Sequence, residues 1–298
     1  MARALAPEGF SWSQLEPGQL HADQEVADLG AVQVVRLSFS LGLRAEGELP
    51  PGKRLIGTLG DSRMTARWFG VEGNGEYVAT SRRAVDLCTH AASTFYCATI
   101  DERPLDNLSS GVSDAIASID ASSNGRLTHD RALARRLRVG MKTILEAYKR
   151  TTQGAPASLR TKVDRLFTPL LALSLERGDT ATAVPRSLTR RIAAVRACEA
   201  YVREHVESNP TLSDLTIVSG LRLRSLINAF QAVTGLSPMA YLKKTRLGNV
   251  RRMLQHADKE RTRIIDVAAN LGFWHMGHFT ADYRAMFGET PSDTLRRG

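Results

Sequence analysis

One motif occurs twice in the last third of this chain, and it constrains the fold more than any other feature. Each copy contains a short apolar segment, a glycine, a longer segment, a second glycine and then Ser-Pro or Thr-Pro. The copies span residues 211–238 and 264–291. Their two glycines are 15 residues apart in the first copy and 16 in the second. Such a repeat indicates two copies of one supersecondary unit.

Each piece of the motif has a physical reason. A glycine after a short apolar helix can adopt the left-handed conformation that ends a helix cleanly, as Gly220 and Gly272 would. A Ser or Thr N-cap followed by proline at the first helical position then starts another helix at once. The second helices are anchored by apolar pairs, Leu226 with Phe230 and Phe279 with Tyr283. The spacing therefore predicts two helix-turn-helix motifs, about residues 211–234 and 264–287, whose second helix fits a DNA major groove.

The segment between the two motifs predicts a rigid connecting helix. Residues 238–256 carry an apolar face made of Tyr241, Leu242, Leu247, Val250 and Leu254. At ~1.5 Å per residue the helix would be about 28 Å long. Neighbouring major-groove faces on one side of B-DNA are ~34 Å apart. We expect this connector to hold two recognition helices over successive major grooves.

The positive charge of the chain is concentrated in the same region. Residues 186–298 hold 18 Lys and Arg against 10 Asp and Glu, whereas residues 1–185 hold 22 against 21. Nearly the whole net charge of +9 therefore belongs to the C-terminal part. This asymmetry predicts a polyanionic partner, with nucleic acid favoured over an anionic membrane.

The N-terminal part has the pattern of a small β-sandwich or barrel. β-branched and aromatic runs at residues 31–39, 54–59 and 93–100 predict strands. Asn74-Gly75, between residues 68–71 and 77–80, predicts a β-hairpin. The expected fold class is α+β: a small β-sandwich or barrel at about 28–103, helices at about 110–177, and an all-α C-terminal domain with the two helix-turn-helix motifs.

The expected domain boundaries follow from these patterns. Residues 1–180 would form a regulatory and dimerisation domain, 181–187 a linker within a small, polar stretch, and 188–298 the DNA-binding domain. Apolar stripes on the helices at 134–150 and 159–175 require a covering surface. That surface is either the chain's own β domain or a second copy, and a homodimer through the N-terminal part is the prediction.

Composition excludes several other classes. The length of 298 residues is typical of about two domains. Three cysteines are too few for a disulfide framework or a zinc cluster, so neither metal nor cofactor is expected. No apolar stretch reaches the ~18 residues of a membrane span, and the start carries no signal-peptide pattern. The chain is expected to act in the cytoplasm, at the nucleoid, without contacting a membrane.

Over about residues 192–297, the sequence resembles the AraC/XylS family of bacterial transcription regulators. The first recognition helix and connector resemble the family in residues 230–238, Tyr241-Leu242 and Arg246-Leu247. The family's second signature is similar to residues 265–268, 271–273, His278-Phe279, Phe287-Gly288 and Pro291. Residues 274–279, Trp-His-Met-Gly-His-Phe, depart from the small polar residues usual there and resemble the ethanolamine-operon regulators. The resemblance implies a cupin-like or jelly-roll regulatory domain, promoter DNA and RNA polymerase as partners, and a small-molecule effector.

The predicted DNA-contacting residues lie on the exposed turns of both recognition helices. Arg pairs with guanine and Asn with adenine in the major groove, and by resemblance Arg224 and Asn228 occupy base-reading positions. The predicted base-reading set is Arg222, Arg224, Ser225, Asn228, His275, Met276 and His278. The predicted phosphate-binding set is Lys243, Lys244, Arg246, Arg251, Thr280 and Arg284. For each residue the alternative is an ordinary solvated helix face.

Three alternatives stay open at this stage. A jelly-roll enzyme, or a small-molecule-binding protein fused to a DNA-targeting domain, would present clustered His and carboxylate ligands on its strands. Only His21 and His90 occur in the β region, and Cys88 and Cys97 have the pattern of buried strand residues. A DNA-repair or architectural protein could use the same two motifs. The additional N-terminal domain favours a sensor, so no catalytic residue is predicted; target promoters, effector identity, and activation versus repression are left open.

Overall fold

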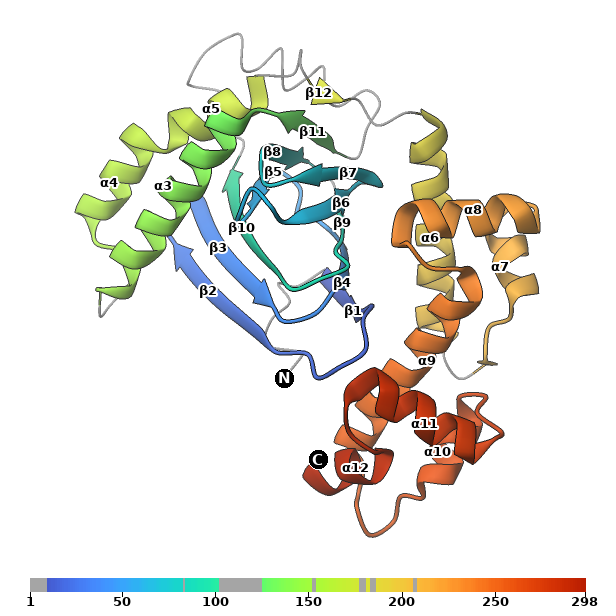
Figure 1. Ribbon diagram of the computed structural model, residues 1–298. Helices are drawn as coiled ribbons and strands as arrows, with labels where there is room; N and C mark the ends of the chain where they lie inside the picture. The colour runs from blue at the N-terminus through green and yellow to red at the C-terminus, as the bar shows by residue number, and fades with distance from the viewer. Residues whose placement is uncertain are drawn as a thin grey trace. The chain divides into compact units, whose positions relative to one another are not determined.

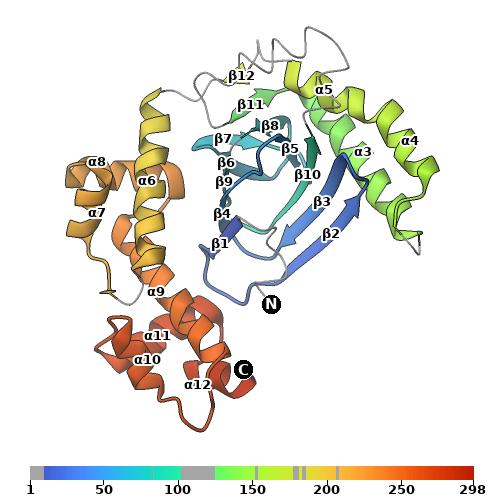
Figure 2. The same cartoon turned by 180° about the vertical axis from the view of Figure 1, so that it is seen from behind.

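The protein is described by a computed structural model that covers residues 10–82, 84–101, 125–151, 154–176, 181–182, 186–205 and 208–298 (Figure 1). The chain divides into two compact units. The β unit contains residues 1–12, 22–40 and 45–189, and the helical unit contains residues 13–21, 41–44 and 190–298. The predicted α+β fold, with strands followed by helices and then an all-helical part, is confirmed (Figure 2).

The strands form two sheets with antiparallel pairing. The five-stranded sheet has the order β1-β4-β9-β6-β7, and the seven-stranded sheet has the order β12-β11-β8-β5-β10-β3-β2. The strand bounds are β1 (Phe10–Gln14), β2 (Ala22–Asp28), β3 (Val32–Phe39), β4 (Leu43–Glu48), β5 (Lys53–Leu59), β6 (Thr65–Trp68), β7 (Val71–Asn74), β8 (Tyr77–Ser81), β9 (Ala84–Cys88), β10 (Ser93–Asp101), β11 (Arg126–His129) and β12 (Ala181–Thr182). The predicted strands at 31–39, 54–59 and 93–100 correspond to β3, β5 and β10. Ala98 of β10 lies opposite Val34 of β3 and Ile56 of β5, so small and β-branched residues fill the centre of the larger sheet.

The hairpin predicted at Asn74-Gly75 is wrong. β7 pairs with β6, while β8 pairs with β5 and β11 in the other sheet, so the Asn-Gly segment crosses between sheets. The hairpin turn is instead Phe69-Gly70, with φ of 52° and 74°, the positive values that both centres of a type I′ turn need. Gly75 serves close packing, because a Cβ there would lie 2.0 Å from the carbonyl oxygen of Asp61.

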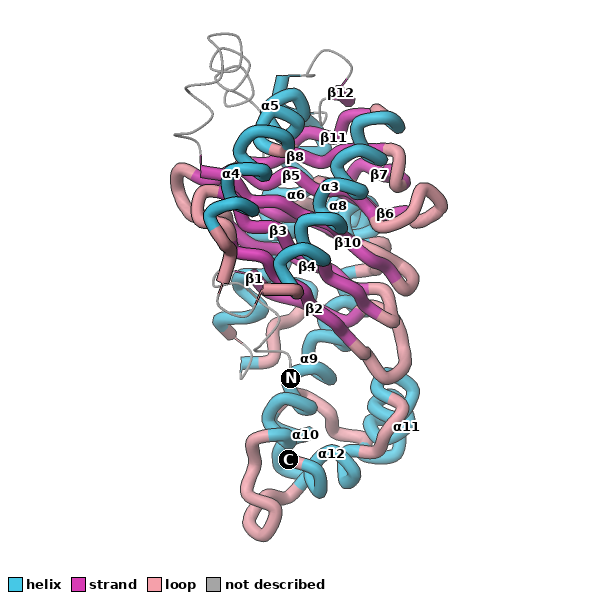
Figure 3. Tube along the Cα trace, turned by 90° about the vertical axis from the view of Figure 1, so that its left-hand side faces the viewer, coloured by secondary structure: helices cyan, strands magenta, loops and turns pink. Residues whose placement is uncertain are grey.

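Helices α3 (Arg131–Lys149), α4 (Ala157–Leu166) and α5 (Thr168–Glu176) belong to the β unit, and α3 covers one face of the seven-stranded sheet (Figure 3). The side chain of Asp130 caps α3 by accepting from the Leu133 amide at 2.9 Å. The apolar stripes predicted at 134–150 and 159–175 are buried in the chain's own core. That core contains Leu133, Leu137, Met141, Ile144, Leu145, Val163, Phe167, Leu171 and Leu175 together with Val34, Ile56, Val78 and Ala98.

Four strands lie outside the β segment predicted at about 28–103: β1 and β2 start before it, and β11 and β12 follow it. β11 falls within the predicted helical segment 110–177, and it pairs with β8. β12 falls within the predicted linker and pairs with β11. The remainder of the predicted helical segment before residue 125 lies outside the described residues.

The helical unit consists of two helix-turn-helix motifs on a shared connecting helix. Its helices are α6 (Arg186–Glu204), α7 (Leu212–Ser219), α8 (Leu223–Thr234), α9 (Pro238–Gln255), α10 (Ile264–Asn270), α11 (Met276–Phe287) and α12 (Pro291–Arg297). Side chains of α9, α10 and α11 share one core, among them Leu247, Val250, Leu254, Val267, Leu271, Phe279 and Tyr283. No helix among the described residues is long and apolar enough to span a bilayer.

Candidate nucleic-acid interface

The first helix-turn-helix motif is formed by α7 and α8. Thr211 and Asp214 make a capping box that begins α7, in which the Asp214 carboxylate accepts from the Thr211 amide at 2.8 Å. These hydrogen bonds, that from the Thr211 hydroxyl above all, lower the pKa of Asp214. Gly220 ends α7 with φ of 64°, a value that favours glycine. The chain therefore turns sharply into α8, as the spacing predicted.

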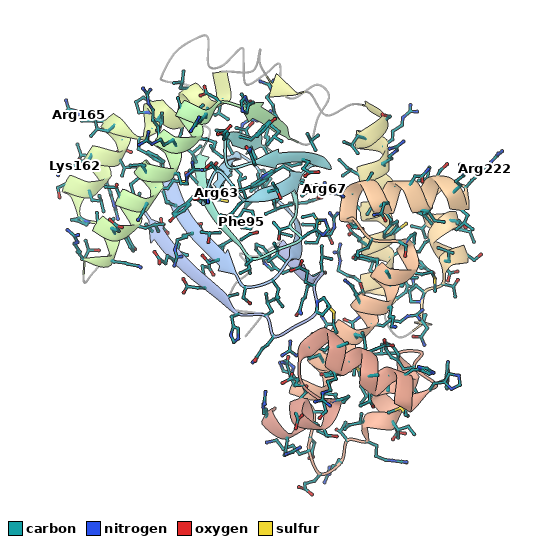
Figure 4. All side chains as sticks on the ribbon, viewed as in Figure 1. Arg63, Arg67, Phe95, Lys162, Arg165 and Arg222 are labelled. Carbon is teal, nitrogen blue, oxygen red and sulfur yellow. The ribbon has the colours of Figure 1, made fainter. Side chains whose placement is uncertain are left out.

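α8 presents the predicted base-reading residues of the first motif to solvent. Leu226, Ala229 and Phe230 are buried against the unit's interior. The opposite face and the first turn carry Arg222, Arg224, Ser225 and Asn228, and all four are exposed. Arg222 is the N-cap residue and lies at the outer end of α8 (Figure 4). This face can therefore offer two guanidinium groups, a hydroxyl and an amide to a groove.

The second motif, formed by α10 and α11, repeats this arrangement with differences. Gly272 has φ of 79° and lies two residues beyond the end of α10, after the C-cap residue Leu271. No side chain caps α10, so the capping box of the first motif is not repeated. His275 is the N-cap residue of α11, and Phe279 and Tyr283 are buried beneath it. Burial raises the pKa of the Tyr283 phenol to about 12, and its oxygen lies 2.8 Å from the Thr294 hydroxyl.

The predicted residues of α11 lie mostly on its solvent side. His275, His278, Thr280 and Arg284 are exposed, whereas Met276 is half-buried. The imidazole rings of His275 and His278 meet edge to face, with centroids 6.2 Å apart. Among the residues that the structure describes, no three His, Cys, Asp or Glu side chains gather in a metal-binding arrangement.

α9 connects the two motifs and has the predicted apolar face. Ser237 caps it by accepting from the Ala240 amide at 3.2 Å, with Pro238 at the first helical position. Its 18 residues give a length of about 27 Å at ~1.5 Å per residue. Tyr241 and Leu242 are buried near its start and Leu254 near its end. One rigid helix therefore joins the two recognition helices.

The predicted phosphate ligands of α9 prove to have partners inside the helical unit. Lys243 Nζ lies 2.7 Å from Asp282 Oδ1 of α11. Lys244 donates to the carbonyl of Leu15, a residue of the same unit, and desolvation lowers the pKa of its ammonium. Arg246 donates to the carbonyl of Pro210 at 2.7 Å, and burial lowers its pKa too. Lys243 is 52% exposed and still faces water, whereas Lys244 and Arg246 are half-buried.

Arg251 is held even more firmly. Its guanidinium approaches Glu289 Oε1 to 3.0 Å and lies 4.8 Å from the centroid of the Phe287 ring. Glu289 is 8% exposed and also pairs with Arg297 at 2.7 Å. Thr294 donates to the same carboxylate at 2.9 Å. This network joins the end of α11 and α12 to α9 through Arg251, whose side chain is 22% exposed.

The sequence interpretation missed several residues on the recognition faces. Leu223 and Ile227, one turn apart on α8, are 46% and 40% exposed beside Arg224. On α11 an open surface hollow is lined by Met276, Gly277, Thr280, Ala281, Arg284 and Ala285. The residues that the sequence interpretation missed are Leu223, Ile227, Gly277, Ala281 and Ala285. Their signal is positional: they lie opposite the buried anchors by helical periodicity, but as apolar or small residues they lack side-chain groups that hydrogen-bond bases. Such side chains can contact thymine methyl groups.

Cys88 and Cys97, which the sequence indicates as buried strand residues, belong to the β unit. Burial raises the pKa of the Cys97 thiol to about 12, so it stays protonated near neutral pH. Cys88 is 1% exposed. These surroundings match the interpretation of both as packed strand residues.

The helical unit is similar to known helix-turn-helix proteins. A family model described as a helix-turn-helix domain matches residues 216–297. The XylDLEGF operon transcriptional activator of Pseudomonas putida is 34% identical over 97 residues, which are 33% of this chain and 30% of that protein. The transcriptional activator RhaS of Klebsiella pneumoniae is 29% identical over 133 residues, 45% of each chain.

A solved structure of a probable AraC family transcriptional regulator from Rhodopseudomonas palustris is 40% identical. It corresponds to 35% of this chain and 96% of that one, with a TM-score of 0.33. The chain spans about a third of the length of the first curated relatives that it matches. The matched residues cover both recognition helices and the connector between them. Through its helical unit, this chain belongs to the AraC/XylS family of helix-turn-helix transcription regulators.

Proposed function

We propose that this protein regulates transcription by binding double-stranded promoter DNA, with α8 and α11 in successive major grooves. The observation that carries the proposal is the pair of recognition helices with exposed faces on one rigid connector, α9. A connector of about 27 Å is of the same order as the ~34 Å between neighbouring major-groove faces on one side of B-DNA. The relatives named above are transcription regulators, which supports a regulator over an enzyme.

Within this function, the exposed residues of the recognition helices divide into two roles. Arg224 and Asn228 are proposed to read bases, with Arg222, Ser225, His275, Met276 and His278 beside them. Thr280, Arg284 and Lys243 are proposed to contact phosphates, which position the protein without reading sequence. The internal partners of Lys244, Arg246 and Arg251 favour a structural role for these three cations.

The β unit is proposed to modulate this binding. Two relatives are named activators, which supports activation as the output. RNA polymerase is the proposed partner, and the cytoplasm is the proposed location. A small-molecule effector and a homodimer remain predictions. Since the apolar stripes of α3 and of α4–α5 are buried in the chain's own core, a dimer would need another surface. Light scattering on the full chain at micromolar concentration tests it: a dimeric mass supports the prediction, and a monomeric mass contradicts it.

Selection from a random duplex pool tests the proposed function. The full chain should enrich one site with two blocks of preferred bases, about one helical turn or 10 base pairs apart. Arg224→Ala should erase the preference at one position in one block and leave the other block intact. Enrichment of no site, or of a single block that does not change in the variant, would contradict the proposal.

A further inference from the structure

The near-neutral N-terminal part of the chain conceals a strongly basic segment. Residues 131–176, which form α3 to α5, hold ten Lys and Arg against three Asp and Glu. The rest of residues 1–185 hold twelve against eighteen. The two contributions nearly cancel in the total, so the charge of this segment appears only when it is counted separately.

Helical packing directs these charges outward. Leu133, Leu137 and Met141 of α3 are buried against the sheet. The basic residues fall on the opposite side, and the exposed ones are Arg131, Arg135, Arg136, Lys142, Lys149 and Arg150 at α3 and Arg160, Lys162 and Arg165 of α4. Figure 4 shows Lys162 and Arg165 on the outer side of α4.

Four of the ten cations have partners within the unit. Arg131 pairs with Glu76, Lys142 with Glu146, and Lys149 with Glu25. Arg138 donates to the carbonyls of Leu59 and Gly75. The remaining six cations make no side-chain hydrogen bond or ion pair with any residue that the structure describes. We name this set of side chains the α3–α4 basic face; it consists of Arg135, Arg136, Arg150, Arg160, Lys162 and Arg165. Six unpaired like charges repel one another, and a bound polyanion would offset that cost.

We propose that the α3–α4 basic face binds the phosphate backbone of double-stranded DNA without regard to sequence. Basic residues that cluster along helices are the electrostatic footprint of nucleic acid. Five of the six are Arg, whose planar guanidinium binds phosphate in a bidentate manner. This inference rests on the proposed function, because DNA bound by the helical unit is present at high effective concentration for weak additional contacts.

Two other occupants fit the face less well. In a contact with a second copy of this chain, the six unpaired cations of one face would lie against the same six of the other, and the two faces would repel each other. An acidic protein would require an apolar centre for its interface, and each of α3 and α4 exposes one large apolar side chain, Val139 and Leu166 respectively. Phosphates need only the cations that are present.

The salt dependence of DNA binding by the full chain tests the inference. The variant Arg160→Gln/Arg165→Gln removes two charges from the face. The control Lys53→Gln/Arg63→Gln removes two cations of the same unit outside the face: Arg63 is exposed, and Lys53 is half-buried and pairs with Asp101. Each protein is titrated with a duplex of about 20 base pairs that holds only the recognition site, and with one that extends the site by several helical turns. On the long duplex the face variant should show a slope of log K against log salt that is less negative by about 1 to 2, with no change in the control.

The short duplex distinguishes two sources of phosphate. If the face binds the flanks of the same DNA, all proteins behave alike on the short duplex. If it binds a second DNA, wild type takes up two short duplexes per chain and the face variant one. Either result supports the inference. The variant Arg135→Gln/Arg136→Gln on α3 should behave like the α4 variant in both DNA titrations, and its unfolding midpoint should equal that of wild type.

Equal slopes on the long duplex, with one short duplex bound by every protein, would overturn the inference. Binding of polyglutamate that depends on Arg160 and Arg165, with unchanged DNA slopes, would overturn it too and assign the face to acidic proteins. Failure of the proposed function has a different signature. Wild type would then bind promoter and random DNA equally well, while the slope difference on the long duplex would persist.

Discussion

Lys243 of the connecting helix and Asp282 of the second recognition helix form an ion pair, with Nζ 2.7 Å from Oδ1. Their side chains are 52% and 33% exposed, so water screens the attraction and the pair contributes little to folding stability. Its consequence is electrostatic. A carboxylate beside the exposed face of α11 neutralises a cation that phosphate would otherwise attract.

Replacing this carboxylate should strengthen DNA binding. Asp282→Asn removes a negative charge near the proposed interface and releases Lys243. The affinity should rise on cognate and random duplexes alike, and the slope of log K against log salt should become more negative by about 0.9 for one added phosphate contact. Asp258→Asn, in the loop after α9, serves as the control and should leave both unchanged. A weaker affinity for Asp282→Asn would show that the pair positions α11 for binding.

The turn glycines should be costly to replace. Gly220 and Gly272 have φ of 64° and 79°, so alanine at either position should destabilise the protein by about 1–2 kcal/mol. Gly272→Ala should cost more, because its Cβ would lie 3.0 Å from Asn209 Oδ1, whereas nothing lies within 4 Å at Gly220. Gly248→Ala, inside α9 with open space around it, is the control and should stabilise by about 0.5–1 kcal/mol. Urea unfolding measures all three, and equal stabilities would contradict the turn geometry.

Acid should remove the contribution of the α7 capping box. Hydrogen bonds from Thr211 lower the pKa of Asp214 in the folded protein, so its charged form stabilises folding above the unfolded pKa. Asp214→Asn should therefore be less stable than wild type at pH 7, and the difference should vanish as the pH falls through the lowered pKa, below about 4. Asp266→Asn, at the matching position of the second motif, is the control, since no side chain caps α10. Unfolding curves from pH 7 to acid provide the measurement, and a constant difference would refute the role.

The sequence and the structure predict different roles for Arg251: the sequence predicts a phosphate ligand, and the structure predicts a stabilising partner of Glu289. As a phosphate ligand it would, on replacement by Met, lower DNA affinity with little effect on stability. The structure instead predicts a loss of about 2 kcal/mol in unfolding free energy, because Glu289 loses one of its two cationic partners while mostly buried. Denaturant unfolding and DNA titration of the same variant separate the two roles. An unchanged unfolding free energy would contradict the structural one.

Helical periodicity predicted the helical unit well, because each helix there buries one face against its neighbours. Leu226 and Phe230, as well as Phe279 and Tyr283, are buried as their spacing indicated. The hairpin prediction failed for a different reason. Phe69 adopts a positive φ that its residue type disfavours, so Gly70 is the one residue of the true turn whose type favours the turn conformation.

The functional surfaces were predicted only in part. Exposure of Arg224 and Asn228 followed from their place on an amphipathic helix. The partners of Lys243, Arg246 and Arg251 come from segments distant in sequence, so no local pattern could assign them. The α3–α4 basic face was hidden because acidic residues elsewhere in the β unit cancelled its charge in the count.

Sequence discrimination by the full chain tests the central claim most directly. Affinities of wild type and Arg224→Ala for the selected site and for random duplex are measured between about 50 and 200 mM salt. Wild type should prefer the site at every salt concentration, and Arg224→Ala should lose about 1–3 kcal/mol on the site with little change on random DNA. Equal affinity of wild type for site and random DNA, or an equal loss on both in the variant, would contradict base reading by α8.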